Sequence, residues 1–413
     1  MSQFIGLESC KSWHKIQASN LVNKQIVIQI DATSTTEEAC LKLIQHNISS
    51  IPLYDQKSHS YLGLFDLNDL LKHITLCLEN NHFLPPSSHN SNSLLSQSLT
   101  HNDPLSDSSS SSTQPPNNDS SFLNKSVLKL TDISTVDPFY AILPETTLAQ
   151  ILDIFSSKIH RVAVMGDSSK ITGILSQSTL IKYLVNSLSD FKIKLDASID
   201  NNFPIHSDPE LSKLLNTSLL DLNLAYKTTW AAYPDTPITS ALNTLEKNSF
   251  SSIPILDPSG SIITSLSLSD IKYLVLPKFR HLINRSCLEL VQSVRYQQGI
   301  QTGKDSAPVI SAHPEDPLKV VISKLAATST HRIWILFSNN SKLPPKNLPS
   351  DFSSLNAPIV NILNANNSHK RLSRSSIVDG SLCGVVSLTD IIATISKLTN
   401  SPKKYSIDYS SMD

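Results

Sequence analysis

Short apolar stretches alternate with polar turns and amphipathic helical patterns in the same order four times along the chain. Each copy begins with a short β-branched segment and a turn rich in Pro, Thr and Asp, and continues with a helical pattern. In the third copy Ile238, Ala241 and Leu245 are spaced at i, i+3 and i+7, which puts them on one face of a helix. A strand, a turn, a second strand and a closing helix follow. The pattern predicts an α/β protein built from four β-α-β-β-α repeats.

The two central strands of each copy are its clearest signal. They are expected at 48–55 and 61–65, 160–165 and 171–175, 250–256 and 262–266, and 331–336 and 382–386. Opening strands are expected at 26–30, 139–143, 228–233 and 307–312, and closing helices at 66–74, 176–185, 267–275 and 387–395. A unit of this size cannot close a hydrophobic core alone, so neighbouring copies must pack together.

The repeats are predicted at 12–80, 127–187, 224–280 and 305–398. A Ser- and Asn-rich insertion, 81–126, separates the first two, and its composition predicts disorder because it cannot bury enough apolar surface. A polar insertion, 338–380, interrupts repeat 4 and is expected to be functional or disordered, as long loops in compact domains are. The remaining segments are a connector at 188–223, a connector helix within 281–304 that the pattern extends over 278–299, and a flexible tail at 399–413.

Composition narrows the class of protein. The 413 residues carry a formal net charge of −1, which argues against general attraction to nucleic acid or anionic membranes. Five scattered cysteines without a C-x-x-C pair favour free thiols in a reducing compartment. No secretory signal and no run of about 18 apolar residues is present. We therefore expect a cytoplasmic protein, with the nucleus as a second location, and neither nucleic acid nor membrane as a partner.

Catalytic motifs are missing from the sequence. The nine glycines form neither a G-x-x-x-x-G-K phosphate loop nor a G-x-G-x-x-G dinucleotide loop. The sequence also lacks H-E-x-x-H and metal-spaced Cys/His clusters. Since the repeats leave no domain-sized segment for an enzyme, we expect no catalytic residue, no metal and no required cofactor.

Two short motifs alternate between the copies. Copies one and three contain Ser-Ser-Ile-Pro at 49–52 and 251–254, whereas copies two and four contain His-Arg at 160–161 and 331–332. This alternation resembles the CBS (cystathionine-β-synthase-type) domain family, arranged as two tandem pairs called Bateman modules. The stretches LTDISTVDPF, IHRVAV with GILSQ, and THRIW are similar to the fungal four-CBS proteins of the suppressor-of-dis (Sds/Moc) family. The resemblance covers nearly all of the chain outside its linkers and implies two modules, packed as a flat disk.

The resemblance also implies AMP, ADP or ATP as a regulatory ligand. In CBS proteins the closing helix begins with G-h-h-S/T-x-x-D, and the Asp typically holds the ribose of a bound adenosine nucleotide. A carboxylate can accept both ribose hydroxyls in charge-assisted hydrogen bonds. Repeat 4 keeps the pattern as Gly384, Ser387 and Asp390, and repeat 3 keeps Asp270. A plain helix N-cap is the alternative explanation of Ser-x-x-Asp.

The N-terminal module departs from the pattern. In repeat 1, Asp66 replaces the hydroxyl residue although Asp69 remains, and in repeat 2 Thr179 stands at the Asp position. Ser49 stands where γ subunits of AMP-activated kinase carry a phosphate-binding Arg. We therefore expect the N-terminal module to bind nucleotide more weakly and to serve as a partner-binding surface.

The two His-Arg pairs are candidate phosphate ligands. In the kinase γ subunits such pairs occur in the second and fourth repeats and contact phosphate, which implies this role for His331 and Arg332, and more weakly for His160 and Arg161. The guanidinium fork matches phosphate, although surface cations at a helix C-terminus are an alternative. For the adenine the resemblance points to residues that strand packing alone could also explain: Thr229, Ser251, Ser252, Pro254 and Val385.

The Sds/Moc resemblance implies a regulator that inhibits type-2A-like protein phosphatases, with effects on the cell cycle, cell separation and the starvation response. A γ-type subunit of an AMP-activated (SNF1-like) protein kinase and a structural scaffold with empty pockets are the alternatives. Phosphorylation is expected at Ser373, which follows Lys370 and Arg371, and at Ser401, which precedes Pro402. Chance matches in Ser-rich sequence would look the same.

Overall fold

The computed structural model describes residues 13–23, 25–80, 125–166, 169–187, 208–303, 309–338, 358–363, 369–373 and 379–399. The predictions of disorder for the insertion up to residue 124 and for the tail from residue 400 lie outside the described residues. The predicted phosphorylation site Ser401 lies outside them as well.

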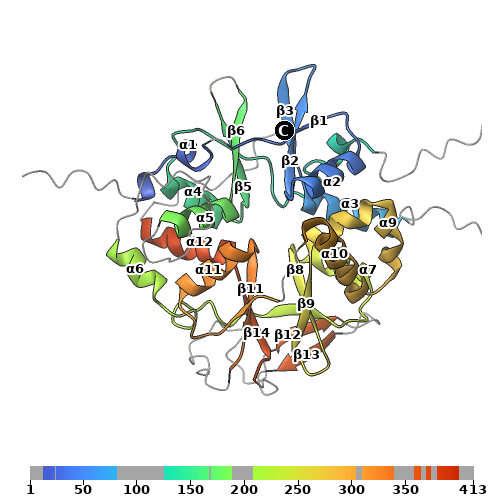
Figure 1. Cartoon of the computed structure of the whole chain (residues 1–413), viewed down its shortest axis with the longest axis vertical. Coiled ribbons are helices and arrows are strands. Elements are labelled where there is room, and N and C mark those ends of the chain that lie inside the picture. The colour runs from blue at the N-terminus through green and yellow to red at the C-terminus, as the bar shows by residue number, and fades with distance from the viewer. Residues whose placement is uncertain are drawn as a thin grey trace, which may run out of the picture.

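Four copies of the β-α-β-β-α unit are present, which confirms the predicted fold class (Figure 1). Repeat 1 consists of β1 (Ile30–Asp31), α2 (Thr36–Gln45), β2 (Ser50–Asp55), β3 (Ser60–Asp66) and α3 (Leu67–Glu79). Repeat 2 consists of β4 (Ala141–Ile142), α4 (Leu148–Ser156), β5 (Arg161–Met165), β6 (Ile171–Ser176) and α5 (Gln177–Ser187). Short helices η1 (Trp13–Lys15), α1 (Ala18–Leu21) and η2 (Val127–Leu130) precede these repeats.

The C-terminal repeats follow the same order. Repeat 3 consists of β7 (Thr229–Ala232), α7 (Ile238–Lys247), β8 (Ser252–Leu256), β9 (Ile262–Ser267) and α8 (Leu268–Ile271), which continues as η3 (Lys272–Val275). Repeat 4 consists of β10 (Ser311–Ala312), α11 (Leu318–Thr328), β11 (Arg332–Leu336), β14 (Leu382–Ser387), α12 (Leu388–Ser396) and η7 (Lys397–Thr399). Helix α6 (Pro209–Leu215) lies in the connector between the modules.

Each repeat builds its own small sheet, in which the opening strand pairs parallel to the second strand and the third strand pairs antiparallel to it. The opening strands are shorter than the sequence predicts. Ile26, expected in a strand, is 83% exposed, and β1 starts only at Ile30. The residues before β1, β4 and β7 are used instead for contacts with a neighbouring repeat.

Three glycines mark where those preceding segments cross a neighbouring sheet. A Cβ atom on Gly173 of β6 would lie 2.4 Å from Cβ of Val22, which precedes repeat 1. A Cβ on Gly63 of β3 would lie 2.6 Å from Cγ2 of Thr131, which precedes repeat 2. Because real Cβ atoms do not approach so closely, only glycine admits the crossing segment. Repeats 1 and 2 therefore exchange their leading segments, and Gly384 of β14 shows that repeat 4 receives the segment before repeat 3.

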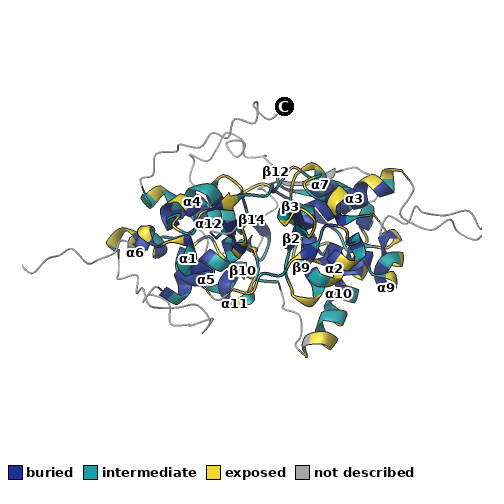
Figure 2. Cartoon of the chain, turned by 90° about the horizontal axis from the view of Figure 1, so that it is seen from above, coloured by how far each residue is buried: buried dark blue, intermediate teal, exposed yellow. Residues whose placement is uncertain are grey.

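The helices pair differently from the sheets. Helices α4 and α5 of repeat 2 pack against α12 and α11 of repeat 4, whereas α3 of repeat 1 packs against α7 and α8 of repeat 3. Two hydrophobic cores result, one shared by repeats 2 and 4 and the other by repeats 1 and 3. Figures 1 and 2 show a flattened body with one helical lobe on each side and the strands between them.

Part of the polar insertion of repeat 4 is ordered, which corrects the expectation of a loop. Strands β12 (Pro358–Leu363) and β13 (His369–Ser373) form a hairpin that extends the sheet of repeat 3 in the order β13-β12-β7-β8-β9. Val360, Ile362 and Leu363 are at most 4% exposed. Burial of these apolar side chains accounts for the order, and the predicted phosphorylation site Ser373 ends the edge strand.

The connector helix also differs from the prediction. Residues 277–284 form α9 (Pro277–Arg280) and η4 (His281–Asn284), and the long helix α10 (Cys287–Thr302) begins only afterwards. Arg285 has an extended backbone and separates η4 from α10. Ser286 follows it and caps α10 by accepting a hydrogen bond from the backbone N–H of Glu289. A side-chain cap of this kind fixes where a helix starts.

Two general expectations can be compared with the described residues. The four cysteines among them are free and buried. The helices of this part of the chain are all too short or too polar to cross a membrane.

Candidate functional site

Asp390 lies at the start of α12, where the sequence predicts the ribose carboxylate. Its Oδ2 accepts hydrogen bonds from the backbone N–H of Ser387 at 2.9 Å and from the Ser387 hydroxyl at 2.7 Å. Nζ of Lys227 lies 3.1 Å from Oδ1. The Asp390 side chain is 25% exposed and that of Lys227 is 53% exposed. Because this lysine is flexible and solvated, a ribose could replace it on Oδ1 at small cost.

Lys227 is a site residue that the sequence analysis missed. It precedes β7 and belongs to the segment that crosses β14 at Gly384, where a Cβ would lie 2.1 Å from the carbonyl oxygen of Ala225. The glycine of the G-h-h-S-x-x-D pattern is the sequence signal that some segment must cross there. The identity of that segment depends on the pairing of repeats 3 and 4.

Arg332 joins repeat 4 to repeat 3. Its guanidinium donates to the Ser251 hydroxyl and, over 3.4 Å, to the backbone carbonyl of Ser252. Burial lowers the pKa of Arg332 to about 10, while the nearby charge of Asp390 raises it. The structure thus brings together five of the predicted site residues: Ser251, Ser252, Arg332, Ser387 and Asp390.

His331 lies among cations from two repeats. His331 itself is exposed, and four basic side chains from repeats 2 and 4 lie near it. This crowding and the charges of Arg332, Arg161, His160 and Lys182 lower the pKa of His331 to about 4. A group of side chains that repel one another in this way would be stabilised by an anion.

Arg161 is already paired on one side. Its Nε lies 3.2 Å from Oδ2 of Asp137, and the backbone N–H of His160 donates to Oδ1 of the same carboxylate at 3.1 Å. Within the described residues, Nη1 of Arg161 is buried without a hydrogen-bond partner. Asp137 therefore competes with any phosphate at the second His-Arg pair.

Asp270 of repeat 3 lies in a closed environment. Nη1 of Arg295 on α10 is 2.6 Å from its Oδ1, and Nη2 is 3.3 Å from its Oδ2. The Asp270 side chain is 1% exposed. Both carboxylate oxygens are used and water is excluded, so ribose could reach Asp270 only by displacing a bidentate guanidinium. No feature of the sequence around Arg295 indicates this pairing.

The carboxylate of Asp69 in repeat 1 is occupied by backbone N–H groups. Its oxygens accept from the backbone N–H groups of Asp132 at 3.1 Å and Ser134 at 3.0 Å. In repeat 2, the hydroxyls of Ser176 and Thr179 bond to each other at 3.0 Å. Of the three candidate carboxylates, only Asp390 has a partner that exchanges easily.

The predicted adenine residues are part of the sheets. Thr229 is 7% exposed, and its backbone pairs with Val360 of the inserted hairpin. Pro254 is buried in β8. Val385 lies opposite Trp334 and packs against the core of repeats 2 and 4. These three residues have the surroundings that strand packing predicts.

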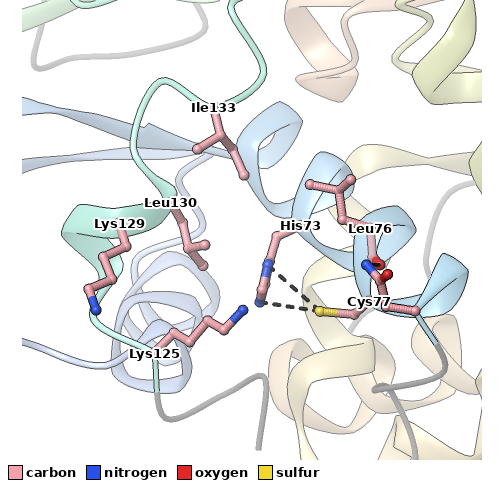
Figure 3. A pocket seen from close by; sticks show the side chains of 8 residues that line it. His73, Leu76, Cys77, Lys125, Lys129, Leu130 and Ile133 are labelled. Atoms are coloured by element: carbon pink, nitrogen blue, oxygen red, sulfur yellow. Dashed lines mark hydrogen bonds between the residues drawn. The ribbon is translucent and has the colours of Figure 1, made fainter. Parts of the chain in front are cut away.

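A pocket of about 300 Å³ opens between α3 and η2 in repeat 1 (Figure 3). Figure 3 shows the His73 ring directed at the Cys77 sulfur, which lies 3.7 Å from Nε2. Leu76, Leu130 and Ile133 supply apolar walls; the remaining lining residues are Asn80, Lys125 and Lys129. None of the predicted nucleotide residues lines this pocket. No group of three or more His, Cys, Asp or Glu side chains in the described segments could hold a metal ion.

Comparison with known protein families identifies CBS domains in the first two repeats. Residues 18–76 and 130–186 match the CBS domain. The chain is 26% identical to protein SDS23 of Vanderwaltozyma polyspora over 96% of this chain and 70% of the relative. It is 27% identical to SDS23 of Saccharomyces cerevisiae over 90% of this chain and 66% of the relative. The chain thus spans about two thirds of the length of these relatives.

Solved structures share the fold. Protein MJ1225 of Methanocaldococcus jannaschii, described as an archaeal homologue of the AMP-activated kinase γ subunit, matches 92% of this chain and all of its own length, with 11% identity and a TM-score of 0.55. The CBS domain protein PAE2072 of Pyrobaculum aerophilum, complexed with AMP, matches 40% of this chain with a TM-score of 0.26. The first similarity confirms the four-repeat fold, and the second is too low to locate a ligand.

Proposed function

The first two repeats match the CBS domain and the chain resembles SDS23, and from this premise we propose that it is a non-catalytic regulator that binds an adenine nucleotide at Asp390 of its C-terminal module. The observation that carries the proposal is the contrast between three carboxylates. Asp69 is saturated by backbone amides and the buried Asp270 by the bidentate Arg295, whereas Asp390 faces the exchangeable Lys227. Arg332 lies close enough to influence Asp390 electrostatically and would meet the phosphate.

Calorimetric titration of the whole chain with AMP, ADP and ATP tests the nucleotide site. We expect binding by the wild type and at least tenfold weaker binding after Asp390→Ala combined with Arg332→Ala, since both the ribose acceptor and the phosphate donor are lost. Arg285→Ala is the matched control, because the exposed Arg285 forms an ion pair with Glu289 at the surface, at 3.9 Å, away from Asp390 and Arg332 in sequence. Unchanged affinity in the double variant would rule out the proposed site.

The 2′-deoxy nucleotide isolates the role of the carboxylate. If Asp390 binds the ribose, loss of one hydroxyl leaves an acceptor unsatisfied and weakens binding by about 1–3 kcal/mol. The comparison is made by competition against the ribonucleotide in one titration. Equal affinity for the two nucleotides would exclude Asp390 from ribose recognition.

For the partner, we propose inhibition of a type-2A-like protein phosphatase in the cytoplasm, with the nucleus as a second location. The resemblance to SDS23 over most of the chain supports this role. Affinity capture from cell extract followed by mass spectrometry is the test, with an assay of the captured phosphatase at increasing amounts of this protein. Stoichiometric kinase α and β chains in the capture would favour the γ-type kinase subunit instead.

A further inference from the structure

Repeat 1 buries two neighbouring carboxylates at the start of α3. Asp66 is 1% exposed and Asp69 is 2% exposed. Asp66 caps α3 by accepting from the backbone N–H groups of Asn68 at 2.8 Å and Asp69 at 2.9 Å. Repeats 3 and 4 carry the neutral Ser267 and Ser387 at the same cap position. Repeat 1 has therefore replaced a neutral cap with a second negative charge beside Asp69.

Asp69 holds the segment that connects the two N-terminal repeats. Residues 131–137 cross β3 at Gly63 and donate the backbone N–H groups of Asp132 and Ser134 to the Asp69 carboxylate. The segment ends at Asp137, which binds the His-Arg pair at the start of β5 in repeat 2. The Asp69 contacts thus fasten one end of a direct connection between repeat 1 and repeat 2.

The charged groups that face this pair come from three elements. Asp66 and Asp69 belong to the start of α3, Asp132 and Asp137 to the connecting segment, and Arg161 with His160 to the start of β5. Arg161 is paired with Asp137, at 3.2 Å. Asp66 and Asp137 therefore both face the charge of the one arginine, Arg161.

Burial and charge repulsion act together on these acids. Burial and the charge of Asp66 raise the pKa of Asp69 to about 7. Burial also raises the pKa of Asp66, even though the charge of Arg161 opposes the shift. Burial and the charge of Asp66 raise the pKa of Asp132. Protons are therefore held at this cluster at pH values where exposed carboxylates are ionised.

We propose that the Asp66–Asp69 pair is a proton-sensitive latch that fastens the 131–137 segment to α3. With a proton on the pair, one negative charge is removed and the carboxyl oxygens still accept the two backbone N–H bonds. With both carboxylates ionised, their repulsion loosens the start of α3 and the segment attached to it. The latch does not depend on nucleotide binding.

The direction of the pH dependence follows from the raised pKa values. Between the unfolded pKa of about 4 and the folded pKa near 7 of Asp69, the closed state binds more protons than the open state. Closure of the latch is therefore favoured at low pH, weakens as the pH rises through this window, and becomes constant above it.

Hydrogen exchange measured by mass spectrometry on the whole chain tests the latch. After correction for intrinsic exchange, the opening equilibrium of the peptide that contains Asp132 and Ser134 should rise between pH 5.5 and 7 by up to about tenfold per pH unit, and should then level off. Asp66→Ser, which reproduces the cap of repeats 3 and 4, should flatten this dependence while α3 stays capped. Asp55→Ser is the control, because Asp55 is an exposed turn carboxylate of the same repeat and its loss should leave the pH dependence unchanged.

Asp69→Thr, the residue found in repeat 2, should expose the peptide to exchange at every pH. Protection that does not vary with pH in the wild type would overturn the latch, as would an equal pH dependence in Asp66→Ser. Wild-type protection in Asp69→Thr would show that this carboxylate does not hold the segment. Asp66→Ser retains every histidine of the chain, so the comparison with this variant removes any contribution that the histidines make to the pH dependence.

Discussion

Replacing Arg295 with alanine should lower the free energy of unfolding by about 3–5 kcal/mol, the usual effect of leaving a buried charge without its partner. The Asp270 side chain is almost completely buried, and Nη1 and Nη2 of Arg295 each donate to one of its oxygens. The substitution would leave a buried carboxylate with its N-cap contacts to Ser267 and no bidentate counter-ion. Chemical denaturation of the whole chain at pH 7 measures the change.

Two further variants make the test specific. Arg285→Ala removes an exposed arginine beside the same helix and should change stability by less than about 1 kcal/mol. Asp270→Asn combined with Arg295→Met removes both charges and should recover much of the stability lost in Arg295→Ala. If Arg295→Ala were as stable as Arg285→Ala, Asp270 would not depend on this ion pair and would become available as a second nucleotide carboxylate.

Replacing Gly384 with alanine should destabilise the protein by about 3 kcal/mol, at the upper end of the usual cost of overpacking. The new Cβ would lie 2.1 Å from the carbonyl oxygen of Ala225, and a backbone atom cannot rotate away as a flexible side chain can. The 225–227 segment must move off β14, which also takes Lys227 away from Asp390. Thermal unfolding and nucleotide titration of the same variant should show both effects.

Gly260→Ala is the matched comparison for this substitution. Gly260 has a φ of +89° and open space around its Cβ position, so alanine there brings backbone strain of about 1–2 kcal/mol without a clash. A Gly384→Ala variant that loses less stability than Gly260→Ala would contradict the close crossing of the two segments.

The repeat architecture could be predicted because its signals are local. Apolar spacing and recurring turns define each unit, and the Ser387 to Asp390 spacing predicts the helix cap that is found. The sequence analysis missed the hairpin of β12 and β13 because most residues of the insertion around it are polar. The β-branched residues Ile359, Val360 and Ile362 of β12 are nevertheless typical of a strand.

The partners of the three carboxylates could not be predicted in the same way. Arg295 lies 25 residues after Asp270, and Lys227 lies 163 residues before Asp390. The backbone N–H groups that donate to the Asp69 carboxylate belong to a segment that follows the long insertion. Similar S/D-x-x-D motifs therefore differ in availability through tertiary contacts with residues whose identity the motif does not reveal.

Because each hydrophobic core is formed by two repeats that are distant in sequence, the four repeats depend on one another for folding. Each core takes one repeat from either half of the sequence, so neither half can complete a hydrophobic interior when separated from the other. We expect one cooperative unfolding transition rather than two. Loss of a single repeat by gene truncation would expose two apolar faces at once. The four repeats together therefore form the smallest unit that we expect to fold stably.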